Sequence, residues 1–305
     1  MTQLVEGTFQ GWPSWTLRQN DCALSVVPGV GGRLMGIQCA GTELCFINPE
    51  LVGLHGSEDP EIWQCLCGDW SFPLWGGGKT WVAPASAWPG GNPQVDLDSG
   101  SYCLTKTWVD KASAGIELES PICRQSSLRI RRRLWLTAGV SGWNVEHTLI
   151  NEGNEPVRCG LWDVLMLRRP GVVEVALVAR GVRPRAEGFC AIAGNGELED
   201  LRRREIIAAD RDKVTIRCQH AQQYKVGIAG VTGSIKIELK LPEGRFEYWR
   251  TVPIAALEPY AHGHPVEVFN APRHPYFEIE SHSPLATIPP GGRSSYHVRE
   301  GVRAL

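Results

Sequence analysis

Short runs of alternating apolar and polar residues recur along most of the chain, and turns rich in glycine and proline separate them. Alternation with a period of two is typical of β-strands, because successive side chains of a strand point to opposite faces of the sheet. Glycine and proline number 34 and 21 of 305 residues, which suits many short strands joined by turns. The strand-like runs are 22–38, 101–109, 128–137, 143–150, 157–168, 172–179, 213–218, 224–231, 234–241, 245–252, 266–269 and 276–282.

One helical pattern of apolar positions stands out, around residues 197–209. Many strands without interleaved helices indicate a large antiparallel sandwich, so the expected fold class is all-β with at most one short helix. The chain is long enough for a sizeable core, and no repeat or low-complexity linker interrupts it. We therefore predict a single β-sandwich domain over residues 1–305.

The charge of the chain is balanced, with 31 basic and 33 acidic residues. This balance gives no electrostatic reason to expect a nucleic acid or an anionic membrane as partner. No apolar run approaches the roughly 20 residues that span a bilayer, and no signal peptide is visible. The ten cysteines form no CxxC pair, so we expect reduced, mostly buried thiols and a cytoplasmic location.

Four tryptophans and one lysine gather in residues 70–91, together with a glycine triplet. A tryptophan in an irregular segment presents a flat apolar face with one hydrogen-bond donor, which suits the C–H-rich face of a sugar ring. We therefore take Trp75, Lys79, Trp81 and Trp88 as candidate substrate-binding residues. The alternative is a rigid loop that the tryptophans hold on the edge of the core.

The tripeptide Gly78-Lys79-Thr80 matches the end of a phosphate-binding loop, but the first glycine of that motif would fall at Pro73. The residues that follow read as extended chain, so no helix N-terminus is present to bind a phosphate. We therefore do not expect nucleotide binding.

The segment 275–284 offers acid–base groups. If it is a strand, Glu278, Glu280 and His282 share one face, with apolar residues on the other. Neighbouring carboxylates repel each other, which raises one pKa toward neutrality and suits general acid–base catalysis. We take Glu280 and His282 as catalytic candidates and Glu278 as a substrate-binding candidate. The alternative is the polar outer face of an edge strand.

The sequence His262-Gly-His264, followed by Glu267, could bind zinc, manganese or iron on a strand, because both imidazoles would then lie on one side. The motif also resembles that of cupin-type barrels, but its spacing from histidine to glutamate is one or two residues too short. Pro259 and Pro265 favour a loop instead. We therefore expect no metal ion and no other cofactor, and keep His264 as a candidate acid.

Residues 151–163 run from a turn into a strand that ends with Trp162 and Asp163. Alternation turns these two side chains to opposite faces, so we expect only one of them to reach a groove. Trp162 is a candidate for binding substrate, and Asp163 is a candidate acid. Asp163 could equally form a buried structural pair with an arginine.

Several segments together resemble the galactose mutarotase-like (aldose 1-epimerase-like) proteins, over most of residues 20–300. The matching segments are 27–37 with a Pro-x-x-Gly-Gly corner, 42–49, 151–163 with an Asn-x-x-x-x-Pro strand, 280–284 with Glu-x-x-x-Pro, and 288–291. The resemblance implies a β-supersandwich with a concave sugar-binding face, and an activity that interconverts the anomers of free aldoses.

The sequence departs from this family at the family's histidines. Trp162 and Asp163 stand where a histidine should follow the Asn/Pro strand, and the segment around Lys79 replaces the Asn-His-x-x-His-Gly motif. Glu280 carries over, and the resemblance implies that it is the general base for the anomeric hydroxyl. Arg33 joins the substrate-binding candidates because this corner lies beside the groove in the family. These departures indicate a diverged branch.

Three functions remain open. The first is an aldose 1-epimerase-like isomerase of a small carbohydrate, with Glu280 as base and His282, His264, Asp163 or Lys79 as acid. The second is a non-catalytic sugar-binding or sugar-sensing protein, which the missing histidines favour. The third is a cupin-like metal-dependent enzyme, which would require a bound metal.

Overall fold

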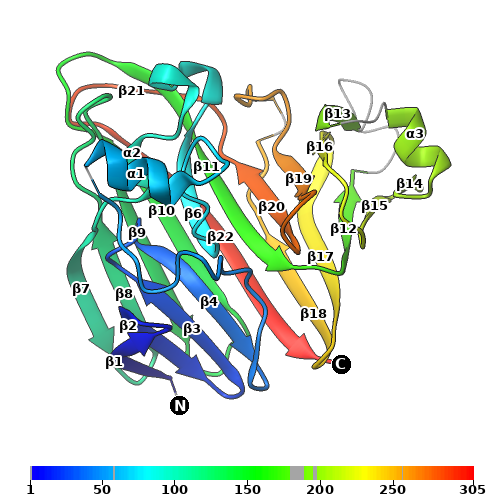
Figure 1. Cartoon of the computed structure of the whole chain (residues 1–305), viewed down its shortest axis with the longest axis horizontal. Coiled ribbons are helices and arrows are strands. Elements are labelled where there is room, and N and C mark those ends of the chain that lie inside the picture. Colours follow the sequence, from blue (N-terminus) through cyan, green and yellow to red (C-terminus); the bar gives the residue numbers. More distant parts are fainter. Residues whose placement is uncertain (1, 58, 179–188, 195–197, 256) are drawn as a thin grey trace.

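The computed structural model has two large antiparallel sheets that stack as a sandwich (Figure 1). It describes residues 2–57, 59–178, 189–194, 198–255 and 257–305. The predicted all-β class and the antiparallel sandwich are confirmed.

The first sheet has 12 strands, ordered β1-β2-β3-β4-β6-β11-β20-β19-β16-β13, with β5 paired to β4 and β21 paired to β11. Its strands are β1 (Gln3–Phe9), β2 (Trp12–Gln19), β3 (Cys22–Val27), β4 (Arg33–Cys39), β5 (Thr42–Glu43), β6 (Gly78–Ala83), β11 (Val157–Arg168), β13 (Phe189–Gly194), β16 (Tyr224–Ile228), β19 (Val266–Asn270), β20 (Tyr276–His282) and β21 (Ala286–Ile288).

The second sheet has 10 strands, ordered β14-β15-β12-β17-β18-β22-β10-β9-β8-β7. Its strands are β7 (Cys103–Val109), β8 (Ser113–Glu119), β9 (Leu128–Thr137), β10 (Trp143–Asn151), β12 (Gly171–Leu177), β14 (Ile207–Ala209), β15 (Lys213–Cys218), β17 (Val231–Leu241), β18 (Gly244–Thr251) and β22 (Arg293–Ala304).

Buried and more exposed residues alternate along β9, β12, β17 and β18 of the second sheet, as the sequence pattern predicts. In β9, every second residue is buried, while Arg129, Arg131 and Arg133 are half-buried on the other face. The central strands of the first sheet differ, because β20 is buried along its whole length and β11 along most of its length. Both faces of these two strands are therefore covered, one by the second sheet and the other by loops.

The hydrophobic core fills the space between the two sheets. The first sheet contributes fully buried residues such as Leu24, Ile37, Leu161, Leu165 and Ile279, and the second contributes Ile116, Leu134, Leu149, Ile237 and Val298. Removing one such side chain from water contributes about 1.5–3 kcal/mol to folding. Packing of the two inner faces is therefore the main favourable contribution to stability.

The corner between β3 and β4 requires glycine. Gly31 and Gly32 have φ angles of 61° and 55°, a region that side chains with a Cβ disfavour. A Cβ on Gly31 would overlap the carbonyl oxygen of Asp98, and one on Gly32 would overlap the ring of Tyr102. The corner thereby brings Arg33, the first residue of β4, next to Asp98.

The helices are short and lie outside the sheets. The helix predicted around 197–209 is present only as α3 (Leu198–Arg203), because residues 207–209 form strand β14; residue 197 lies outside the described residues. At most one helix was expected, but the structure also has α1 (Pro60–Cys67), α2 (Val95–Asp98) and the 3-10 turns η1 (Ala85–Ala87) and η2 (Pro89–Gly91). These segments are too short to show a helical period in the sequence.

Local capping explains α1. The side chain of Asp59 accepts hydrogen bonds from the backbone amides of Glu61 and Ile62, and Pro60 begins the helix. Gly68 follows its last residue with a positive φ of 55°. The signal that the sequence offered was therefore the Asp-Pro pair, not a periodic pattern.

A buried polar network joins the two sheets. Arg250 Nε on β18 donates to Glu300 Oε1 on β22 over 2.7 Å, and Arg250 Nη1 lies 3.1 Å from Asp163 Oδ2 on β11. His147 Nε2 on β10 lies 3.5 Å from Asp163 Oδ1, and Thr80 Oγ1 on β6 lies 2.8 Å from His147 Nδ1. Asp163 thus forms the buried pair with an arginine that the sequence left open as an alternative.

No helix among the described residues is long and apolar enough to cross a membrane. The nine cysteines whose side chains are described are free thiols, and most of them are buried. This agrees with the expectation of reduced, buried cysteines.

The substitution Arg250→Met should destabilise the fold by about 3–5 kcal/mol, because it leaves Asp163 and Glu300 buried without their cation. Urea unfolding followed by intrinsic fluorescence measures this change. Arg245→Met is the matched control, since Arg245 lies on the same strand but pairs with Glu238 at the surface. It should cost no more than about 1 kcal/mol. Equal losses for the two variants would contradict a special role of the Arg250 network.

Candidate functional site

Charged and aromatic side chains gather on the outer face of the first sheet, where β6, β11, β20, β19 and β16 lie side by side. Trp81 of β6 is opposite Trp162 of β11, and Trp162 is opposite His282 of β20. Two residues before His282, Glu280 is opposite Glu267 of β19. Directly opposed residues of antiparallel strands share a face, so these five side chains project from the same side of the sheet.

Glu267 and Glu280 place two carboxylates side by side, an arrangement that like charges destabilise. Lys225 of β16 resolves this conflict, because its Nζ lies 2.6 Å from Glu267 Oε2 and 2.8 Å from Glu280 Oε2. Trp162 Nε1 donates to the same oxygen of Glu280 over 2.7 Å. Both glutamates are 0% exposed, so their charges depend on these partners and on neighbouring histidines.

Three indoles form a cluster beside Glu280. Trp88 stacks on Trp162 with ring centroids 5.6 Å apart, and Trp81 meets both rings edge-on at 5.2 and 5.0 Å. Trp88 Nε1 donates to the carbonyl of Val82 over 2.6 Å, which fixes the orientation of its ring. Trp88 is half-buried while the other two are buried, so it is the indole of this cluster that faces solvent.

Lys79 of β6 lies against the indole cluster. Its Nζ is 3.5 Å from the ring centroid of Trp81 and 3.8 Å from Glu278 Oε1. Burial lowers the pKa of Lys79 to about 8, although Glu278 attracts its ammonium group. A lysine with such a pKa can exchange a proton near neutral pH.

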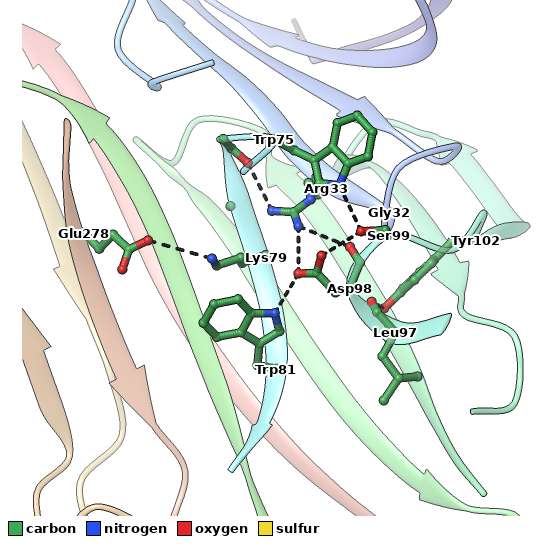
Figure 2. Close-up of polar contacts among 12 residues, drawn as sticks. Gly32, Arg33, Trp75, Lys79, Trp81, Leu97, Asp98, Ser99, Tyr102 and Glu278 are labelled. Atoms are coloured by element: carbon green, nitrogen blue, oxygen red, sulfur yellow. Dashed lines mark hydrogen bonds and ion pairs between the residues drawn. The ribbon is translucent and has the colours of Figure 1, made fainter. Parts of the chain in front are cut away.

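Next to Lys79, Arg33 and Asp98 form a fully buried ion pair, which Figure 2 shows. Arg33 Nη2 donates to Asp98 Oδ1 over 2.8 Å, and Trp81 Nε1 donates to the same oxygen over 2.6 Å. The hydroxyl of Ser99 donates to Asp98 Oδ2 over 2.7 Å. Burial would raise the pKa of Asp98, but Arg33 and these donors hold it below its ordinary value. The hydrogen bond from Trp81 to Asp98 in this network fixes the orientation of the indole ring.

Three histidines surround Glu267. His262 Nδ1, His264 Nε2 and His282 Nε2 lie 2.8, 2.7 and 3.3 Å from Glu267 Oε1. Gly227 of β16 makes room for this arrangement, because a Cβ there would overlap the ring of His264. Ligand atoms of His262, Glu267 and His282 all lie within 4.8 Å of one another, so these three residues could hold a metal ion.

The environments of the two carboxylates differ. Burial raises the pKa of Glu280 well above its usual value, and Lys225 opposes this shift. Burial acts in the same direction on Glu267, but the three neighbouring histidines lower its pKa below the ordinary value. Burial lowers the pKa of His282 to about 4. Carboxylates whose pKa values are pushed apart in this way are typical of acid–base sites.

Most of the site residues predicted from the sequence come together. The outer face holds Lys79, Trp81, Trp88, Trp162, His264, Glu278, Glu280 and His282. The strand that carries Glu280 lies inside the sheet, between β11 and β19, and not at its edge. Arg33 lies beside this face in the network of Figure 2.

Two predicted residues lie elsewhere. Trp75 is fully buried in a separate apolar cluster with Trp12 and Met35, where its Nε1 donates to Ser99. Asp163 projects to the inner face and pairs with Arg250. We therefore leave both out of the candidate site.

Lys225 and Asp98 were not among the site residues predicted from the sequence. Lys225 is a single charged residue in the apolar run of β16, and that isolation was the available signal. Asp98 ends the four-residue helix α2, and no local pattern singles it out. Both belong to the site because they bond residues more than 15 positions away in the chain: Asp98 bonds Trp81, and Lys225 bonds Glu280.

Neither a family model nor a curated protein sequence matches the chain. Solved structures match it over nearly its whole length. They include a galactose mutarotase-like protein from Clostridium acetobutylicum (TM-score 0.59, 10% identity, 100% of this chain and 99% of that one) and another from Lactobacillus casei ATCC 334 (0.58, 8%, 95% and 100%). The Slr1438 protein of Synechocystis sp. PCC 6803 also matches (0.60, 12%, 99% and 100%).

These similarities define the fold. The chain has the galactose mutarotase-like fold, so the resemblance predicted from the sequence is confirmed at this level. The identities of 8–12% show likeness of fold alone. Because one fold supports many functions, the function must be argued from the site.

The substitution Lys79→Met should remove a pH-dependent contribution to stability. The pKa of Lys79 is about 8 in the folded protein against an ordinary 10.5, so the unfolded chain binds more protons between these values. The stability of the wild type therefore rises with pH in this window. Relative to Lys79→Met, the wild type should gain about 2 kcal/mol between pH 7 and pH 9.5. Urea unfolding at both pH values measures the gain.

The exposed Lys106 supplies the control for this comparison. Lys106→Met should keep the pH dependence of the wild type. If Lys79→Met also keeps it, the pKa of Lys79 is not lowered and the interpretation is wrong.

Proposed function

We propose that the outer face of the first sheet binds a carbohydrate and that the protein interconverts the anomers of an aldose or a sugar phosphate, with Glu280 as proton acceptor. The observation that carries this proposal is the position of Glu280, a buried carboxylate in the middle of five strands and beside three indoles. Indole faces pack against the C–H side of sugar rings, and charged groups bond their hydroxyls. The fold shared with galactose mutarotase-like proteins supports the proposal by analogy.

Exchange of anomers requires one base and one acid. Glu280 takes the proton of the O1 hydroxyl, the bond between C1 and the ring oxygen breaks, and the acid protonates the ring oxygen. Rotation about the C1–C2 bond and the reverse proton transfers then close the ring as the other anomer. The substrate neither gains nor loses protons or electrons overall.

Lys79 is the acid that we favour among the four that the sequence suggested. Asp163 lies on the inner face, and His264 and His282 both gather around Glu267. Lys79 remains, and its pKa of about 8 suits proton donation near neutral pH.

The register of the sheet supports pairing Lys79 with Glu280. Both residues are directly opposite Val164 of β11, one on each side. They therefore share a face two strands apart, a separation of roughly 10 Å between backbones. Two long side chains that start at this separation can approach a sugar ring from either side.

Sugar binding without turnover is the second candidate. Lys225 lies 2.8 Å from Glu280, and an ammonium group at this distance favours the ionised carboxylate and weakens it as a base. The absence of the family's two histidines from their expected positions points in the same direction.

Glu280→Gln should lower the rate of anomer exchange by about 10²–10⁴-fold, because loss of a positioned base has an effect of this size. NMR and polarimetry on several aldoses and sugar phosphates measure the rate above that of buffer. Glu278→Gln should have a much smaller effect, and the exposed Glu155→Gln serves as a control for the loss of one surface charge.

Two outcomes would contradict parts of this proposal. If Glu280→Gln keeps the wild-type rate, Glu280 is not the base. If the wild type binds sugar but never exceeds the buffer rate, the catalytic claim is wrong and the second candidate replaces it.

A further inference from the structure

Three imidazole nitrogens converge on one oxygen atom, Oε1 of Glu267. The separations are 2.7 Å for His264, 2.8 Å for His262 and 3.3 Å for His282. The other oxygen of this carboxylate is already taken by Lys225 at 2.6 Å. Glu267 and His282 are 0% exposed and His264 is also buried, while His262 is half-buried at the edge of the cluster.

Hydrogen bonding alone does not account for this arrangement. A carboxylate oxygen has two lone-pair sites, so it can accept good hydrogen bonds from two imidazoles but not from three. His262 and His264 occupy these sites, and neither ring nitrogen of His282 makes a hydrogen bond. A fully buried imidazole whose ring nitrogens make no hydrogen bond is costly, unless another group at this point uses a lone pair of the ring.

We propose that His262, Glu267 and His282 bind a divalent first-row transition-metal ion, such as Zn²⁺ or Co²⁺. Two imidazoles and one carboxylate are ligands that these ions prefer, whereas Ca²⁺ and Mg²⁺ prefer all-oxygen sites. The ligand atoms of these three residues lie within 4.8 Å of one another, a spread that small shifts onto one ion would close. Only His262, His264 and Glu267 were considered for such a site from the sequence, and the structure adds His282 of β20.

His264 acts as a positioning residue in this site. It hydrogen-bonds Glu267 Oε1, while Lys225 holds Oε2, so the orientation of the carboxylate is fixed before an ion arrives. Trp162 stacks on His282 with centroids 5.3 Å apart and fixes that ring in the same way. Such outer partners set the geometry of metal sites. The positive charge of Lys225 limits the affinity for a dication, and Glu280 offsets it.

The metal proposal goes beyond the proposed function, and its test uses no sugar. The full-length protein, without a histidine tag, is dialysed against a chelator and titrated with Zn²⁺ by calorimetry and with Co²⁺ by visible absorption. We expect one ion per chain, and a higher melting temperature with the ion present because it binds the folded state.

The affinities of single-residue variants for the ion show which side chains bind it. Loss of outer partners typically weakens metal binding about 10–100-fold, so His264→Ala should fall in that range, while His262→Ala and Glu267→Gln should lose more than about 100-fold. The control is His297→Ala, because His297 is exposed on the second sheet and stacks on Trp135. It should bind the ion as the wild type does.

The proposal is wrong if the wild type binds neither ion at one per chain, or if His262→Ala and Glu267→Gln bind as tightly as the wild type. Circular dichroism establishes whether these variants fold. If they do not, the wild type decides the matter, because bound Co²⁺ must shift the NMR signals of the His262 and His282 rings and leave those of His297 in place. Shifts at His297 alone would overturn the proposal.

Discussion

The ion pair between Asp163 and Arg250 fixes the relation of the two sheets and, through it, the position of the candidate site. It buries a carboxylate of β11 against a guanidinium of β18 between the sheets. Side chains of a strand alternate, so with Asp163 held inside, Trp162 must project outward. The pairing of β11 with β20 then places His282 and Glu280 on the same outer face as Trp162. A slip of one residue would exchange the two faces and bury the wrong set of charges.

On the outer face, too, buried charges are held in position by specific partners. Glu267 and Glu280 would repel each other on adjacent strands, and Lys225 between them makes the arrangement tolerable. Similarly, Arg33 pairs with Asp98, and Asp98 accepts the hydrogen bond that orients the ring of Trp81. Because each buried charge has a specific partner, the side chains of the site are held in place before a ligand binds. Such preorganisation is what binding and proton transfer require.

The structure shows what the residues do that depart from the galactose mutarotase-like sequence pattern. Where a family histidine is expected, Trp162 stacks on His282 and donates to Glu280. At this point the chain therefore has an indole that orients the carboxylate of Glu280. Histidines do reach the site, but by another route: His262 and His264 come from the loop before β19, and they gather around Glu267. The fold is shared with the galactose mutarotase-like structures, whereas the histidines predicted from the family pattern are not at the expected positions of this chain.

The sequence by itself determined the fold class, the strand face shared by Glu278, Glu280 and His282, and the opposite directions of Trp162 and Asp163. These features follow from the two-residue period of a strand, which is local. Tertiary structure alone decided which of these residues meet. It separated Trp75 and Asp163 from the site and brought Lys225 and Asp98 to it, because such contacts depend on strand order and register. Pairing of strands far apart in the chain leaves no periodic trace in the sequence of either strand.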